Sequence, residues 1–352
     1  MRAPIVKARA LSPAFGIALK PRLFPRFSRP TFRFEFCLEP RARNTQSAAN
    51  TLFSFSLLSA SFRRMIKSRW GEGQRNRAMQ RRDFLKGLTT AALAGLAASS
   101  AYAQFIEPFA YEVTQTEIAI EGLPDSFDGF RIVQITDVHH SRLVPLEEVR
   151  RVVGLANRAA GDLIVLTGDY TTARRRYIEP CAEVLSELMA PAGVWAVLGN
   201  HDHYTDPELT ARALARAKIN VLGNANTRLR RGAEELQLVG IDDWSWGATD
   251  WKRAFKGTDR KRPIILLSHQ PRVFAMPETE GVSLILSGHT HGGQISLPLL
   301  GAPARFIPEF RFISGLYERN RSKMYVSRGT GMIGLPIRFG VRPEISVIVL
   351  RR

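Results

Sequence analysis

The chain has 352 residues, with 50 Lys and Arg against 32 Asp and Glu, and a formal net charge of +18. A charge of this size usually indicates a partner rich in phosphate, such as nucleic acid or anionic lipid. Residues 1–103, however, hold 19 basic and 4 acidic residues and carry 19 − 4 = +15, so residues 104–352 carry only 18 − 15 = +3. The main part of the chain therefore gives no support to nucleic-acid binding, and we expect no nucleic-acid partner.

Residues 1–78 lack the pattern of a folded domain. They mix Arg, Pro and Phe without a sustained helical or strand period, and no acidic residue precedes Glu35. We expect a non-native or disordered extension. One interpretation is a start assigned too far upstream, with translation beginning at Met79 or Met65. The other is a transit peptide or a basic arm that lies on a membrane surface.

Residues 79–103 have the three parts of an export signal. Arg81–Lys86, which reads RRDFLK, resembles the twin-arginine consensus, and a weakly apolar stretch follows over 87–100. Ala101–Ala103 forms a small-x-small cleavage site, which predicts Gln104 as the mature N-terminus. We expect export by the twin-arginine machinery to the periplasm or cell envelope. The alternative is an uncut, membrane-associated anchor, although the apolar stretch is shorter than the ~20 residues that span a bilayer.

Residues 104–352 are expected to form one α/β domain. Its first half alternates apolar runs with helical patterns, which predicts parallel strands covered by helices. The strands are expected at 130–136, 162–168 and 193–199, and the helices at 145–161, 178–190 and 208–218. Its second half predicts a more mixed sheet, with a hairpin over 227–242 turned on Gly232 and strands at 263–269, 282–289, 292–297, 323–329 and 344–352.

All seven histidines of the chain directly follow predicted strands. They stand in the short sequences TDVHHS, GNHDHY, LLSHQP and SGHTHGG, which are far apart along the chain. The carboxyl ends of strands in open α/β sheets form the crevice where ligands bind. The histidines therefore predict a functional site at that edge.

The side chains expected there are oxygen and imidazole donors, with no thiolate among them: Asp137, His139, Asp169, Asn200, His269, His289 and His291. Such a set suits Mn, Fe or Zn, and seven donors exceed the needs of one tetrahedral ion. Two divalent ions sharing one carboxylate would retain about +2 of charge, which attracts a phosphoryl group. Two such ions also lower the pKa of a bridging water towards ~7, which supplies hydroxide for attack on phosphorus. The donor set therefore predicts a metal-dependent phosphohydrolase.

Five motifs in order, Asp137-x-His139, Gly168-Asp169, Gly199-Asn200-His201-Asp202, His269 and Gly288-His289-x-His291, resemble those of the calcineurin-like metallophosphoesterases. The sequences GGQISLPLLGAP and YVSRGTGMIGLPIRFGVRPEI, together with the twin-arginine leader, are similar to the exported branch that contains YkuE and YaeI.

That resemblance implies a four-layer αββα sandwich of two mixed β-sheets. It implies a first ion held by Asp137, His139, Asp169 and His291, and a second held by Asp169, Asn200, His269 and His289. His201 would stand near the leaving group as a catalytic residue. Asp202 would orient His201 through a ring nitrogen.

The substrate class has two interpretations: a small phosphate ester cleaved by a phosphodiesterase or monoesterase, or a lipid phosphate cleaved by a UDP-2,3-diacylglucosamine pyrophosphatase-like enzyme of lipid A biosynthesis. Export favours the first, and the Phe-rich, Pro-interrupted segment 297–317 favours the second, because it suits a lipid tail or a membrane surface if it is exposed. A catalytically inactive metal-binding scaffold is the alternative from another class.

Three further features have both a structural and a functional interpretation. His140 and His203 are expected in solvent, with substrate contact as the alternative. The tryptophans of the segment DDWSWGATDW are expected to pack in the fold, with stacking on a ligand as the alternative.

Overall fold

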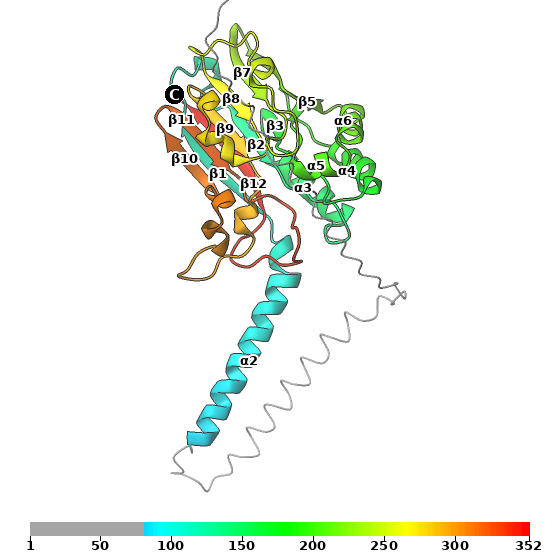
Figure 1. Cartoon of the computed structure of the whole chain (residues 1–352), viewed down its shortest axis with the longest axis vertical. Helices are drawn as coiled ribbons and strands as arrows, with labels where there is room; N and C mark the ends of the chain where they lie inside the picture. Colours follow the sequence, from blue (N-terminus) through cyan, green and yellow to red (C-terminus); the bar gives the residue numbers. More distant parts are fainter. Residues whose placement is uncertain (1–80) are drawn as a thin grey trace, which may run out of the picture. The chain divides into compact units, whose positions relative to one another are not determined.

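The computed structural model describes residues 81–352 (Figure 1). The extension expected over residues 1–78 lies outside the described residues. Within them the chain forms two six-stranded sheets flanked by helices and turns.

The first sheet has the strand order β1-β12-β2-β3-β4-β5. Its neighbours pair in parallel except β12 and β2, which are antiparallel, so the sheet is mixed. Its strands are β1 (Glu112–Ala119), β2 (Arg131–Ile135), β3 (Leu163–Leu166), β4 (Val194–Ala196), β5 (Asn220–Val221) and β12 (Glu344–Arg351).

The second sheet has the order β10-β11-β9-β8-β7-β6. Its two end pairs are antiparallel hairpins, and its inner strands are parallel. The hairpin predicted on Gly232 is confirmed, because β6 and β7 pair up to Arg231 and Glu234. The strands are β6 (Ala225–Arg231), β7 (Glu234–Gly240), β8 (Ile264–Leu267), β9 (Leu284–Ser287), β10 (Gly315–Arg319) and β11 (Ser322–Val326).

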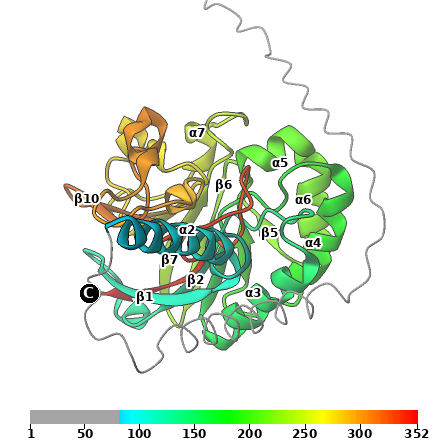
Figure 2. The same ribbon diagram turned by 90° about the horizontal axis from the view of Figure 1, so that it is seen from below.

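Alternating side chains of the central strands divide the core into layers. Ile132 and Leu163 point between the two sheets, whereas their neighbours Val133 and Ile164 point toward the helices. Figure 2 shows these helices together on one side of the sheets. They are α3 (Leu146–Arg158), α4 (Ile178–Leu185) and α6 (Pro207–Arg216). The predicted four-layer arrangement is therefore confirmed on this side.

The outer face of the second sheet has a thinner cover. It consists of one turn of α-helix and several 3₁₀ turns, chiefly α7 (Trp251–Ala254), η4 (Pro271–Ala275) and η5 (Pro277–Thr279). Val239 and Leu266 of the sheet pack there with Phe274. The fourth layer therefore buries the second sheet without a long helix.

The strand predicted at 292–297 is wrong. The chain there forms a 3₁₀ turn, η6 (His291–Gly293), followed by a single bridge from Ile295 to Phe339. Gly292, Gly293 and Gln294 all have positive φ angles, of 62°, 78° and 59°, which no regular strand accommodates. The turn keeps His291 next to His289 at the end of β9.

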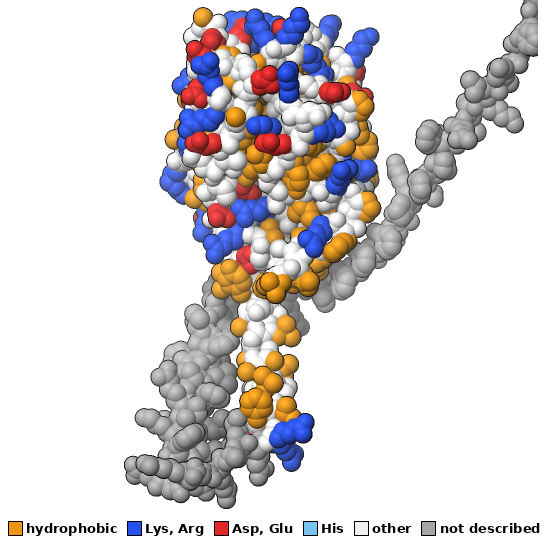
Figure 3. All heavy atoms as spheres, turned by 90° about the vertical axis from the view of Figure 1, so that its left-hand side faces the viewer, with side chains coloured by type: hydrophobic (Ala, Val, Ile, Leu, Met, Phe, Trp, Pro, Cys, Tyr) orange, Lys and Arg blue, Asp and Glu red, His pale blue; other side chains and the backbone are white. Residues whose placement is uncertain are grey.

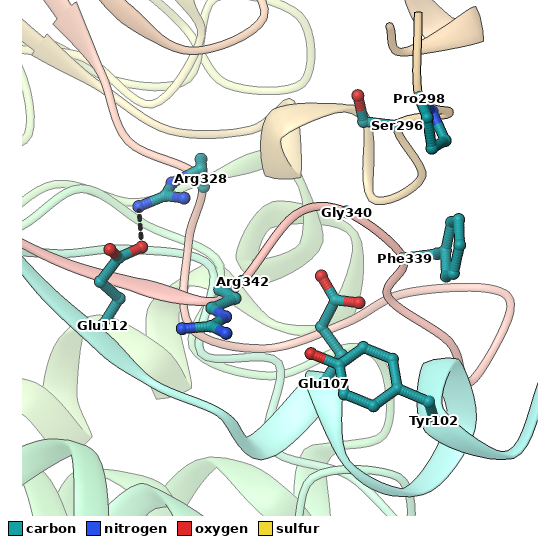
Figure 4. Close-up of a pocket in the computed structure, with 9 residues that line it drawn as sticks. All are labelled: Tyr102, Glu107, Glu112, Ser296, Pro298, Arg328, Phe339, Gly340 and Arg342. Carbon is teal, nitrogen blue, oxygen red and sulfur yellow. Dashed lines mark hydrogen bonds and ion pairs between the residues drawn. The ribbon is translucent and has the colours of Figure 1, made fainter. Parts of the chain in front are cut away.

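The residues of the expected export signal form α2 (Arg81–Phe105), whose side chains are exposed except near its end. Ala103 is buried, and its carbonyl oxygen accepts a hydrogen bond from the Arg338 backbone N–H at 2.9 Å. A cavity of about 500 Å³ lies at this junction. Tyr102, Glu107 and the Glu112–Arg328 ion pair are among the residues that line it (Figure 4). Across residues 81–352, no helix combines the length and apolar character that crossing a membrane requires.

Candidate metal centre

The seven expected donors meet at the carboxyl ends of five strands. Asp137 and His139 follow β2, Asp169 follows β3, and Asn200 begins the short helix α5 (Asn200–Thr205) after β4. From the second sheet, His269 follows β8, and the pair His289 and His291 follows β9. The structure therefore brings donors from both sheets to one place, as the strand ends predicted.

A first group consists of Asp137, His139 and His291, all buried. The Nε2 atoms of His139 and His291 lie 3.1 Å apart, and His291 Nε2 lies 3.4 Å from Asp137 Oδ1. Two donors bound at about 2.1 Å to one ion, and about 90–110° apart, lie ~3.0–3.4 Å from each other. The third distance, from His139 Nε2 to Asp137 Oδ1, is longer at 3.9 Å, so two of the three spacings match donors that converge on one cation.

A second group surrounds His269. Its Nε2 lies 3.2 Å from His289 Nδ1, 3.0 Å from Asn200 Oδ1 and 3.2 Å from Asp169 Oδ2. The same Asp169 oxygen lies 3.5 Å from His139 Nε2 of the first group. Asp169 therefore stands between the two groups, where a shared carboxylate was expected.

Hydrogen bonds from the chain hold both carboxylates in place beside the imidazoles, and the His289 N–H also reaches Asp137 Oδ1, at 3.1 Å. Asp137 Oδ2 accepts from the Thr136 hydroxyl at 2.8 Å and from the His289 N–H at 2.9 Å. Asp169 Oδ1 accepts from the His201 N–H at 2.8 Å. The ring of His269 is oriented in the same way, since Nδ1 contacts the Thr167 carbonyl at 2.8 Å and leaves Nε2 toward the group.

The backbone at these positions is tightly constrained. Five of the seven donors have left-handed φ angles between 50° and 73°, namely Asp137, His139, Asp169, His289 and His291. Such conformations cost about 1–3 kcal/mol each and are concentrated at functional sites. Two motif glycines allow the loops to meet, because a Cβ on Gly199 would clash with Asp169 and one on Gly288 with Asp137.

Burial sets the charge of the imidazoles. It lowers the pKa of His139 to about 3 and that of His289 to about 4, so both rings are neutral and able to coordinate. Burial acts the same way on His269, but the adjacent Asp169 carboxylate outweighs it and raises the pKa of His269 to about 10. Against the opposing effect of burial, the imidazoles hold the pKa of Asp169 far below its usual range. A positive charge beside Asp169 is thus favoured, and the donors present fit a pair of divalent cations.

His201 lies at the rim of the donor cluster. Its ring stands edge-on to His139, with centroids 4.9 Å apart, and its Nδ1 contacts the Thr172 carbonyl oxygen at 2.6 Å. A carbonyl only accepts, so Nδ1 carries a proton and Nε2 is left for other partners.

The expectation that Asp202 orients the His201 ring is wrong. The buried Asp202 carboxylate accepts instead from the backbone N–H groups of Asp169, Tyr170 and Gly199, at 2.8–3.0 Å. Burial and the Asp169 charge raise the pKa of Asp202 to about 7, while these three donors oppose that shift. Asp202 therefore braces the loops that carry Asp169 and Asn200, and the Thr172 carbonyl orients His201.

The expectation that His140 and His203 lie in solvent is also wrong. His140 is buried, with Nδ1 2.9 Å from the Val144 carbonyl and its ring edge-on to Tyr177. His203 Nε2 lies 2.6 Å from Asp242 Oδ1, and this pairing outweighs burial and raises the pKa of His203. Both histidines therefore join elements of the fold.

Arg338 is a residue of the site region that the sequence did not single out. Its side chain is fully buried, and its guanidinium donates to the carbonyl oxygens of Arg328, Gly329 and Gly331. The N–H of Gly331 in turn donates to the Asp137 carbonyl at 2.6 Å. Arg338 thus fixes the loop that packs behind Asp137.

Comparison with known proteins finds relatives that are all described as phosphoesterases or phosphodiesterases. A family model described as calcineurin-like phosphoesterase matches residues 130–293. The chain is 35% identical over 281 residues to the uncharacterized metallophosphoesterase YkuE of Bacillus subtilis (strain 168), an alignment that covers 78% of this chain and 98% of YkuE. It is 31% identical over 276 residues to the phosphodiesterase YaeI of Escherichia coli (strain K12), covering 77% and 99%. A transmembrane protein with metallophosphoesterase domain from Danio rerio is 34% identical over 255 residues, covering 68% of this chain and 57% of that protein.

Proposed function

This chain belongs to the calcineurin-like phosphoesterase family, whose members are hydrolases acting on phosphate esters, and from that premise we propose that it is a phosphodiesterase that uses two divalent ions. The observation that carries the proposal is the pair of donor groups with Asp169 between them. Asp137, His139, Asp169 and His291 would hold one ion, and Asp169, Asn200, His269 and His289 the other. Mn, Fe or Zn fits this donor set.

When bound, such a pair of ions supplies positive charge to the phosphoryl oxygens and makes water more acidic. The side chains of the protein position the loops of the site and donate the proton that the reaction needs. The Nδ1 proton of His201 is engaged by the Thr172 carbonyl, so Nε2 is the atom able to donate a proton to the departing oxygen. Asp202, through its three backbone contacts, keeps the His201 turn and the Asp169 loop in register.

Removal of metal tests this proposal. Treatment with a chelator is expected to abolish hydrolysis of bis(p-nitrophenyl) phosphate, and Mn²⁺, Zn²⁺ or Fe²⁺ is expected to restore it, because imidazoles and carboxylates without the ions provide no Lewis acid for the phosphoryl oxygens. Elemental analysis of the active protein should give about two ions per chain. Activity that survives complete metal removal contradicts the proposal, and a loaded protein inactive on every ester would favour the inactive scaffold instead.

A lipid-linked phosphate is the second candidate substrate class, and a specific contact favours it. The ring of Phe310 stacks on His289 with centroids 6.1 Å apart, so the apolar segment 297–317 contacts the donor cluster at Phe310. Phe306, Leu300 and Leu299 of the same segment have exposed side chains. A UDP-2,3-diacylglucosamine pyrophosphatase-like activity would place acyl chains along this segment. Comparing the hydrolysis rates of phosphate mono- and diesters with those of nucleotide-lipid pyrophosphates distinguishes the two substrate classes.

We also propose that the chain is exported by the twin-arginine route and stays at the cell envelope. Arg81–Lys86 supports the export part of this proposal. The burial of Ala103, its helical conformation and its hydrogen bond to Arg338 favour an uncut anchor, because a cleavage site must be extended to enter a protease.

The same end of the domain is suited to an anionic bilayer. Figure 3 shows hydrophobic side chains gathered along the lower part of the face it displays. The exposed apolar residues of the segment 297–307 are Leu297, Leu299, Leu300, Phe306 and Ile307. The Arg305 guanidinium lies over the Phe306 ring, 5.1 Å from its centroid. Apolar side chains flanked by arginine insert at the boundary between headgroups and acyl chains.

Changing Leu299, Leu300 and Phe306 together to Ser is therefore expected to lower binding of the full chain to vesicles containing phosphatidylglycerol by about tenfold or more. Sedimentation with the vesicles measures this effect. Met189→Ser, which alters an exposed apolar side chain outside the segment, is the matched control. Equal binding by the triple variant and the wild type would show that the segment does not contact the bilayer.

A further inference from the structure

Two exposed aromatic rings extend outward from His201. Tyr204 stands one turn after His201 on α5, and its ring contacts the His201 ring with centroids 5.1 Å apart at 63°. Trp246, from the loop after β7, follows with its centroid 5.9 Å from that of Tyr204. Their exposed fractions are 53% and 64%, so the rings contact each other yet keep most of their surface open. We call Tyr204 and Trp246 the aromatic platform.

Buried polar contacts hold the loop of Trp246 in place. The Asp243 carboxylate, 1% exposed, accepts from the backbone N–H groups of Ser245 and Trp246 at 2.9 and 2.8 Å. Gln270 joins this network through Ser245, whose hydroxyl donates to it at 2.8 Å, and through its own amide, which donates to Asp243. Gln270 adjoins His269 of the donor cluster. The loop of Trp246 is thus fixed relative to the metal centre.

The two halves of the platform are also joined to each other. His203, between His201 and Tyr204 on α5, is paired with Asp242 at 2.6 Å, and Asp242 stands in the loop of Trp246. A second Asp242 oxygen accepts from the Ala248 N–H at 2.8 Å. A short hydrogen bond to a carboxylate between two short segments fixes their separation, so Tyr204 and Trp246 keep their spacing.

We propose that the aromatic platform is a subsite for the leaving group of the phosphodiester and that it binds leaving groups carrying a flat ring, either a nucleobase or an aryl group. The inference rests on the proposed function and adds its substrate class. It follows from the position of the rings, which continue outward from His201, the residue to which the proposed function assigns the departing oxygen. Open faces of Tyr and Trp stack on flat rings of many kinds, because every base or aryl group has a π-face. The apolar segment contacts His289, whereas the aromatic platform contacts His201. The two substituents of a diester would therefore contact different surfaces.

Matched esters test the subsite. The first pair is the methyl phosphodiester of adenosine, joined through its 5′ oxygen, and the same ester of ribose without the base; both release the same kind of alcohol. The second pair is a methyl aryl phosphate and a methyl fluoroalkyl phosphate of equal leaving-group acidity. For the metal-loaded wild type, kcat/KM is expected to be roughly 10-fold or more higher for the ring-bearing member of at least one pair.

Tyr204→Ala and Trp246→Ala are each expected to reduce that preference about 5–10-fold. The preference is the ratio of kcat/KM within one pair, so an effect of the lost ring on His201 changes both esters alike and cancels. Tyr204→Phe and Trp246→Phe keep a ring and should retain most of the preference. Met189→Ala serves as a control away from the platform. A preference in the adenosine pair identifies a nucleobase, and a preference in the aryl pair alone identifies a simple aromatic group.

The outcomes separate this inference from the proposed function. If the wild type hydrolyses both members of each pair equally, or if both alanine variants keep the full preference, the platform is not a subsite although the enzyme is a phosphodiesterase. If the metal-loaded wild type hydrolyses none of the four esters, the proposed function itself fails and the inference with it.

Discussion

Replacing Asp169 by Asn is expected to lower kcat for phosphodiester hydrolysis by about 10³-fold and to reduce bound metal below two ions per chain. Asp169 Oδ2 lies 3.5 Å from His139 Nε2 and 3.2 Å from His269 Nε2, so it is the carboxylate that both donor groups approach. An amide has nearly the same shape but no charge. Two cations would then share one negative charge fewer, and the weaker-held ion should dissociate first.

The fold should tolerate this change better than the chemistry does. Asn retains an acceptor for the His201 N–H, which contacts Asp169 Oδ1 at 2.8 Å, so the loop need not rearrange. Circular dichroism and the melting temperature check that point, and Glu179→Gln, at an exposed ion pair with Arg216, is the charge-matched control. Two retained ions together with a kcat within threefold of the wild type would contradict the bridging role.

The donor cluster could be predicted from the sequence because only a few residue types can bind these metal ions. Only carboxylate, amide and imidazole side chains can serve, and here each follows an apolar run that reads as a buried strand. Strand order is not visible in the sequence, yet it is not needed, since parallel strands place their carboxyl ends at one edge. The structure accordingly brings Asp137 of the first sheet within 3.4 Å of His291 of the second.

The partner of His201 could not be predicted from the sequence, because no particular residue type is required to supply it. The atom that orients its ring is a backbone carbonyl, that of Thr172, and any residue at that position offers the same atom. The acidic neighbour Asp202 was the obvious candidate from sequence, but three backbone N–H groups already occupy its carboxylate. Which partner an ionisable side chain takes depends on loop geometry, which spacing along the chain does not fix.

Edge strands and turns account for the remaining differences. β1 was missed because it pairs only with β12 and shows most of its side chains to solvent, so it lacks an apolar alternation. The strand expected at 292–297 had apolar residues at Ile295 and Leu297, but the glycines before them adopt positive φ angles. A Cβ at Gly292 would also lie only 2.7 Å from Val341 and 2.9 Å from Arg328, so this turn requires a glycine for its space as well as for its φ angle.

His201→Gln is expected to lower kcat by about 10²–10⁴-fold for diesters with a poor leaving group while leaving two bound ions per chain. The assignment depends on one proton: Nδ1 donates to the Thr172 carbonyl at 2.6 Å, so only Nε2 can protonate the departing oxygen. A leaving group that is already acidic needs no such proton, so for p-nitrophenol the loss should shrink to about tenfold or less. Plots of log kcat against leaving-group pKa, for a series of aryl and alkyl esters, measure this difference as a steeper slope in the variant. A purely structural His201 would depress every ester by the same factor, and parallel slopes would therefore remove it from the proton-transfer step while leaving the donor cluster intact.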